Sequence, residues 1–248
     1  MQEVAAWFRS LYETTGLNFT IFYDPYDATQ FARGVGMTIY LSVVSILISL
    51  VVGVIGAWLQ SSRIRLVRGF IEIFVVIFRN TPPLVQIFFF YFGMGELLPA
   101  SYNDIGLREP LLNNVQWAII SLSLFAGAFN IEIFRSGIEA VPQTTVEAAE
   151  ALGYTRLGAY RYVVLPLALR VCLPALNNNL VNLLKTTTLA YAIAVPEALY
   201  AVTQIWAESQ NVTEMMCVLL ATFVLLVGVL VWVMHRWERS LRIPGFGQ

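Results

Sequence analysis

Five long apolar runs dominate the chain, and short polar segments separate each run from the next. They cover roughly residues 36–59, 69–92, 115–134, 167–194 and 215–234. About 20 apolar residues in a helix cross the hydrocarbon core of a bilayer. Each run is long enough, and no polar stretch has the length that a soluble domain needs. The pattern therefore predicts an all-α integral membrane protein with five transmembrane helices.

Composition agrees with a membrane protein and narrows the possible chemistry. Of 248 residues, 58% are hydrophobic and 12% are charged, whereas soluble proteins are about 25% charged. The net charge of −1 provides no bulk attraction to nucleic acid. Cys172 and Cys217 lie inside apolar runs, which favours buried thiols over a disulfide or metal pair. His235, the single histidine, follows the last run and fits an interfacial position, so no metal site is predicted.

Basic residues predict the orientation in the membrane, because short cytoplasmic loops are enriched in Arg and Lys. They cluster after the first, third and fifth runs, at Arg63, Arg65, Arg68, Arg135, Arg156, Arg161, Arg236, Arg239 and Arg242. We therefore expect residues 241–248 to form a cytoplasmic tail and residues 1–31 to lie outside. Residues 32–240 would form the membrane domain.

The N-terminal segment has apolar residues at helical spacing. Val4, Trp7, Phe8 and Leu11 share one face of a helix, with polar residues elsewhere. This pattern indicates a helix lying in the outer membrane–water interface. An irregular connection to the first span is the alternative.

The segment from about 143 to 166 predicts two short helices joined by a turn. Thr144 and Thr145 followed by Glu147 fit a capping box at a helix start. Ala148 and Ala149 have small side chains, so a partner could approach this helix closely. Gly153 permits a turn that a Cβ would resist, and Leu165-Pro166 is expected to begin the next span. The alternative is a re-entrant loop that packs only on its own subunit.

Two polar stripes interrupt the apolar runs. Arg79 lies near the middle of the second run, followed by Asn80, Pro82, Pro83 and Gln86. A charge at that depth should face a partner or a water-filled cavity, and the two prolines remove backbone donors. The second stripe, in the fourth run, consists of Asn178, Asn182, Lys185 and Thr186. Both stripes indicate a substrate path or gate, and hydrogen bonding between helices is the alternative for both.

The sequence offers no catalytic machinery. Glu132 and Arg135 are three residues apart and predict a structural ion pair. No Gly-Lys-Ser/Thr sequence occurs, so a phosphate-binding loop is missing and the chain is not expected to be an enzyme. An ion-coupled secondary transporter would need carboxylates at mid-membrane and inverted repeats. An intramembrane enzyme would need a catalytic dyad or metal set. Neither pattern is readable.

Several motifs together resemble the polar amino-acid uptake family of ABC-importer permeases. These are FRNTPPLVQ from Phe78, IEIFRSGIEAVP from Ile131, EAAEALGYTRLGAYRYVVLP from Glu147, KTTTLA from Lys185 and ERSLRIPG from Glu238. Asn80 and Val163 replace the usual Gly and Ile.

The resemblance implies a type I ABC-importer-like fold in the bacterial inner membrane, with a cytoplasmic coupling loop that includes Glu147, Gly153 and Pro166. The implied partners are two ABC ATPases, a second identical or homologous permease and an extracytoplasmic substrate-binding protein. The substrate would be an amino acid. ATP and Mg would bind the ATPases, and this chain would bind no cofactor.

Overall fold

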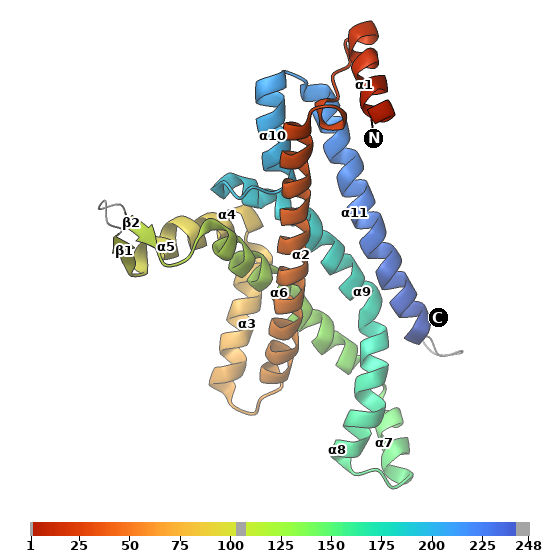
Figure 1. Cartoon of the computed structure of the whole chain (residues 1–248). Helices are drawn as coiled ribbons and strands as arrows, with labels where there is room; N and C mark the ends of the chain where they lie inside the picture. Colours follow the sequence, from red (N-terminus) through yellow and green to blue (C-terminus); the bar gives the residue numbers. More distant parts are fainter. Residues whose placement is uncertain (1, 103–107, 242–248) are drawn as a thin grey trace. The chain divides into compact units, whose positions relative to one another are not determined.

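The computed structural model describes residues 2–102 and 108–241. Within these ranges the regular secondary structure is helical apart from one hairpin, in which β1 (Ala100–Tyr102) pairs antiparallel with β2 (Arg108–Pro110). The expected cytoplasmic tail lies outside the described residues, except for Leu241. Figure 1 shows the order of the helices along the chain.

Four described helices are long and apolar enough to cross a membrane. They are α2 (Pro25–Gln60), α6 (Asn114–Glu139), the helix running from residue 156 to 193, and α11 (Val212–Leu241). A fifth crossing exists if α3 (Arg65–Asn80) and the helical segment Pro83–Leu97, which begins with α4 (Pro83–Phe88), count as one span. The helix α2 begins at Pro25, so its first residues belong to the N-terminal segment 1–31.

The second apolar run is divided by its two prolines. Thr81 is extended, with φ −108° and ψ 143°, because a residue before proline disfavours the α conformation. Pro83 occupies the first position of α4, where a missing N–H costs nothing. A π-helical stretch (Phe89–Met94) and α5 (Gly95–Leu97) follow.

The helix that contains the fourth apolar run begins before the run itself. α8 (Arg156–Ala159), π-helix η3 (Tyr160–Val164) and α9 (Leu165–Thr186) follow one another without a break, and the 3-10 helix η4 (Thr187–Ile193) completes the segment. The Leu165 N–H bonds to the Tyr160 carbonyl. This wider turn lies immediately before Pro166, which has no N–H to donate. α9 itself begins at Leu165, where the sequence places the end of the loop, but it continues the helix from Arg156 without a turn between them.

The described helices belong to two compact units. The first comprises residues 1–45, 83–122 and 184–228. Its core contains Ile21, Val202, Ile205 and Met215. They come from the 3-10 helix η1 (Thr20–Phe22), α11 and α10 (Ala198–Ser209), a helix that the sequence analysis did not expect.

Hydrogen bonds join the N-terminal segment to the start of α11 in this unit. The Asn18 N–H donates to Glu214 Oε1 at 3.0 Å, and Asn211 Nδ2 donates to the Asn18 carbonyl at 2.8 Å. The segment is therefore anchored at the end of a candidate span.

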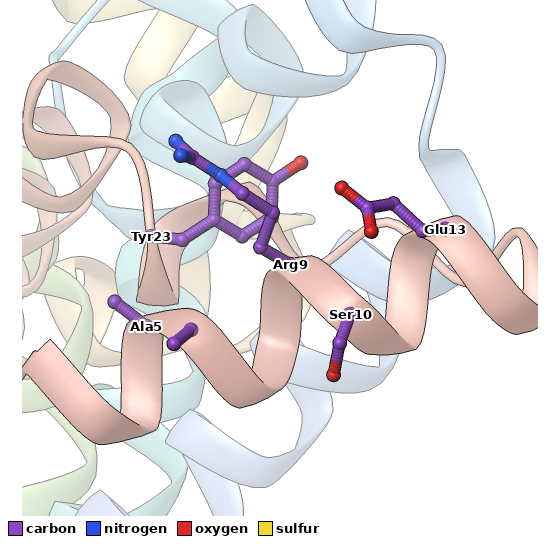
Figure 2. A pocket seen from close by; sticks show the side chains of 6 residues that line it. Ala5, Arg9, Ser10, Glu13 and Tyr23 are labelled. Atoms are coloured by element: carbon purple, nitrogen blue, oxygen red, sulfur yellow. The ribbon is translucent and has the colours of Figure 1, made fainter.

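The N-terminal helix α1 (Gln2–Thr15) packs on η1 through aromatic rings. Phe8 stacks on Phe22 with ring centroids 4.2 Å apart. Figure 2 shows the Arg9 guanidinium beside the Tyr23 ring, 5.6 Å from its centroid, in a depression of about 420 Å³. Trp7 remains 58% exposed. The helix is present, and its interfacial location stays a prediction.

The second unit comprises residues 46–82, 123–183 and 229–248. Here α2 and α6 approach closely, because Gly56 faces Ile131 and Gly127 faces Val52; a Cβ on either glycine would overlap the opposing side chain. α9 and α11 pack together through a cluster of apolar residues that includes Leu176, Leu180, Leu230 and Met234. This unit contains the two-helix loop between α6 and α9.

Candidate functional site

The loop consists of α7 (Gln143–Ala151) and α8, which contact each other side by side (Figure 1). α7 ends in a glycine turn. Gly153 has φ +91° and donates to the Glu150 carbonyl at 3.0 Å, while Tyr154 donates to the Ala149 carbonyl at 3.1 Å. These two bonds define a Schellman motif, which needs a left-handed residue at the glycine position. The requirement for glycine expected from the sequence is met here.

The cap lies at a different helix from the one predicted. α7 follows Pro142 directly and has no side-chain cap, so Thr144 and Thr145 lie within its first turn. The predicted capping box is therefore wrong. Thr155 caps α8 instead, because its hydroxyl accepts from the Gly158 N–H at 3.2 Å. The sequence Thr-x-x-Gly lacks the acidic residue that marks a capping box, and the cap was missed for that reason.

The outer surface of the loop is apolar at its tip. Glu147 and Ala148 are exposed, as a docking surface requires. Ala149 is buried because α7 packs on α8 and η3, so its side chain contacts the loop itself. The expectation that Ala149 faces a partner is therefore wrong. Leu152 and Leu157 are 81% and 77% exposed. Neither leucine was predicted as part of the site, although two large apolar residues that flank a turn in a polar loop are a signal visible in the sequence.

A groove of about 600 Å³ runs between the end of α6 and the loop helices. Its polar lining includes Glu139, Glu150 and Arg156, and its apolar lining includes Val146 and Val164. Leu165 and Pro166, assigned to coupling by the sequence, are exposed on the continuous helix beyond η3. The loop thus joins α6 to α9 through a packed helical pair with exposed charge and apolar surface.

Glu132 and Arg135 form the close ion pair expected from their spacing, with Arg135 Nη2 2.9 Å from Glu132 Oε2. Arg79 also approaches this carboxylate, with Nη1 3.9 Å from Oε2. Its guanidinium lies 5.2 Å from the Phe129 ring centroid. Asn80 donates to the carbonyl of Val76 at 2.7 Å on its own helix. Arg79 therefore has protein partners, Glu132 and Phe129, whose identity could not be read from the sequence.

The polar residues of α9 divide into the exposed stripe and a buried neighbour, Asn179. Asn178, Asn182 and Lys185 are exposed on one face. Asn179 is buried and donates to Asn130 Oδ1 at 2.8 Å, and Asn130 donates to Ser49 Oγ at 3.2 Å. This network ties α9, α6 and α2 together through Asn179, a neighbour of the stripe.

The remaining residues assigned to the path belong to the first unit. Gln86 is buried on α4, and Thr186 is half-buried at the end of α9. Arg79, Asn80, Asn178 and Asn182 belong to the second unit.

A buried carboxylate that the sequence analysis did not assign to a site lies at the start of α10. Glu197 is fully buried and accepts from the N–H groups of Leu199 and Tyr200 at 2.9 and 3.0 Å. The Thr38 hydroxyl accepts from the adjacent Ala198 N–H at 3.0 Å. Burial raises the pKa of Glu197 to about 7, against the lowering effect of these hydrogen bonds. Glu197 is therefore a helix cap that titrates near neutral pH.

Comparison with known proteins identifies the family. The model of the family described as "Binding-protein-dependent transport system inner membrane component" matches residues 49–242. The histidine/lysine/arginine/ornithine transport system permease protein HisM of Salmonella typhimurium is 30% identical over 236 residues, covering 95% of this chain and 94% of HisM. The glutamate/aspartate import permease protein GltJ of Escherichia coli K12 is 32% identical over 217 residues, covering 86% and 87%. The chain belongs to this family of inner-membrane transport components.

The fold agrees with this assignment. A solved structure described as "Crystal structure of an amino acid ABC transporter with histidines" superposes with a TM-score of 0.75 at 25% identity, covering 86% of this chain and 94% of that one. The expected class, a helical multi-pass permease of ABC importers in the inner membrane, is confirmed. The described helices allow four or five crossings, depending on whether the interrupted pair counts as one.

Proposed function

We propose that this chain is the permease subunit of an ATP-driven amino-acid importer and forms its translocation path. The exposed α7–α8 loop is the observation that carries the coupling role, because it presents Glu147 and two exposed leucines on a rigid helical pair. The relatives named for amino-acid transport support the substrate class.

The proposed assembly contains two copies of an ABC ATPase, a second permease, identical or homologous, and an extracytoplasmic substrate-binding protein. ATP and Mg bind the ATPases, and this chain neither binds a cofactor nor hydrolyses ATP. ATP binding draws the ATPases together and moves the loops with them. The membrane bundle then alternates between inward and outward access.

The exposed stripe on α9 supports the path assignment. Asn178, Asn182 and Lys185 present polar groups from a helix whose other faces are largely apolar. Polar and charged groups at membrane depth are costly against lipid, so they face water or protein. Gln86 and Thr186 are included in the proposed path, and Lys185 provides a cation suited to the carboxylate that every amino acid carries.

Reconstitution tests this function directly. The complex with its ATPase and binding protein should transport the amino acid that the binding protein retains, and only with ATP inside the vesicles. Vesicles without the ATPase are the control. Uptake by the permease alone, driven by an ion gradient, would identify a secondary transporter. No uptake by the complete assembly at any tested amino acid would reject the proposal.

A further inference from the structure

Four charged side chains form a continuous row from the end of α3 to the end of α6. Arg79 approaches Glu132, Glu132 bonds to Arg135, and Arg135 Nη1 bonds to both oxygens of Glu139 at 2.8 Å. The three α6 residues are spaced by three and four positions, so they share one helical face. The row contains two positive and two negative charges and is formally neutral. We refer to these four residues as the ionic ladder.

Arg79 is the only ladder residue that is not on α6. Its guanidinium contacts Phe129 and Glu132, which are one turn apart on α6. A cation over an aromatic face and a nearby carboxylate both attract it to this place. Arg79 therefore connects the last turn of α3 to α6, two residues before the extended residue Thr81 and the proline pair.

The contacts of Glu132 are unequal. Its two oxygens take the Arg135 side chain at 2.9 and 3.4 Å, whereas the nearest Arg79 nitrogen is 3.9 Å away. The Gln60 amide also donates to it, at 3.4 Å. Arg79 is 41% exposed and Glu132 is 23% exposed. Opening of the Arg79 contact leaves Glu132 bonded to Arg135 and Gln60, so α3 can part from α6 here without leaving the Glu132 carboxylate unpaired.

The other end of the ladder reaches the loop. Glu139 is the last residue of α6 and lines the groove that also includes Val146 and Glu150 of α7. The ladder thus runs from the helix end beside the proline break to the groove beneath the coupling loop. Both ends are in the same compact unit.

We propose that Arg79 is a positioning residue that transmits movement of the coupling loop to the end of α3, through Glu132, Arg135 and Glu139. This proposal rests on the proposed function of the chain. It gives Arg79 a role in coupling in place of the substrate contact that its depth in the second run indicated. A rigid α6 carries the movement, and the Arg79 contact engages or releases α3.

The experiment is a double-mutant cycle in the reconstituted complex with ATPase and binding protein. Arg79→Met, Glu132→Gln and the double variant are compared for uptake KM, uptake Vmax and amino acid transported per ATP hydrolysed. We expect each single variant to lower transport per ATP about two- to fivefold, the scale of a partly exposed ion pair with a ring contact. The double variant should transport no less amino acid per ATP than the more impaired of the two single variants. The KM for uptake should be unchanged in all three.

Arg68→Met is the matched control. Arg68 is on α3 and forms an exposed ion pair with Glu72 at 3.6 Å, away from the ladder. Its loss should leave transport per ATP at the wild-type value. Arg79→Lys should recover part of the ratio because it keeps the charge, and co-purification with the ATPase shows that each variant assembles. If Arg79→Met does not assemble, the comparison uses Arg79→Lys with Glu132→Gln.

Several results would contradict the proposed coupling role of the ionic ladder. A raised KM with unchanged transport per ATP would place Arg79 on the substrate. Fully additive effects would show that Arg79 and Glu132 act separately, and unchanged ratios would show that neither couples. In each case the wild-type complex still takes up its amino acid. These results would therefore contradict the role of the ionic ladder without contradicting the proposed function.

Discussion

Residue Gly153 determines how the coupling loop turns, because its φ of +91° is strained for any residue with a Cβ. An added Cβ meets no atom within 4 Å. The cost of substitution is therefore conformational and not steric.

We expect Gly153→Ala to destabilise the turn by about 1–2 kcal/mol, the cost of a left-handed conformation for an L-residue. ATP hydrolysis stimulated by the binding protein and uptake should fall together, because α7 and α8 would no longer be held in one arrangement. Both are measured in the reconstituted complex, with thermal melting of the permease as a check that the bundle persists. Gly69→Ala is the matched control, since that glycine also has open space but lies in helix α3. Wild-type coupling in Gly153→Ala would remove the turn from the mechanism.

At the residue scale the sequence predicted types of residue better than their contacts. The glycine turn was readable because few residues tolerate its geometry. The Arg79–Glu132 contact was not, because the two residues are far apart in sequence and no local pattern relates them. Ala149 was placed on the partner side for a similar reason: its small size suits close packing against α8 as well as against a partner.

Helix α10 depends on a buried acid for its first turn. Glu197 is surrounded by protein and caps two N–H groups. Its pKa of about 7 lies above the ordinary value of 4.5 because burial disfavours the charged form. In the folded protein the proton is therefore retained to higher pH than in the unfolded chain. The stabilisation linked to this proton is complete below about pH 4.5 and is lost as the pH rises to about 7.

We expect wild-type melting temperature to fall between pH 5 and 7.5 by more than that of Glu197→Gln, which cannot titrate there. The difference in unfolding free energy approaches about 3 kcal/mol at the full shift, since one pKa unit is about 1.36 kcal/mol. The amide oxygen of Gln still accepts an N–H bond, so α10 should stay capped. Melting of the purified permease in detergent across this range is the measurement. Parallel pH profiles for the two proteins would show that Glu197 titrates normally.

Elements were predictable where length and apolar composition define them. Four candidate spans overlap the apolar runs, and the proline pair marked the break after α3. α10 escaped detection because it is short and is formed by burial against η1 and α11. The β1–β2 hairpin has no alternating apolar pattern of useful length, since each strand has three residues.

For the whole molecule, the interrupted pair decides the topology. If α3 and the helices from Pro83 to Leu97 cross the membrane once, the chain has five spans; if they re-enter on one side, it has four. Basic residues around Arg63 favour the cytoplasm for the turn between α2 and α3. With five spans and this orientation, we expect the N-terminus outside and the end of α11 inside, and the α7–α8 loop in the compartment that contains ATP.

Reporter fusions after Ser62, Asn113 and Gln248 distinguish these arrangements. We expect a reporter that is active only outside the cytoplasm to work after Asn113 and to be silent after Ser62 and Gln248. The physical reason is that one crossing separates Ser62 from Asn113 only if the interrupted pair spans the bilayer. A reporter that works solely in the cytoplasm, fused at the same three positions, should give the reverse pattern and controls for expression. Activity on the same side at Ser62 and Asn113 would make the pair re-entrant. An external signal after Gln248 would reverse the predicted orientation and remove the coupling loop from its proposed ATPase.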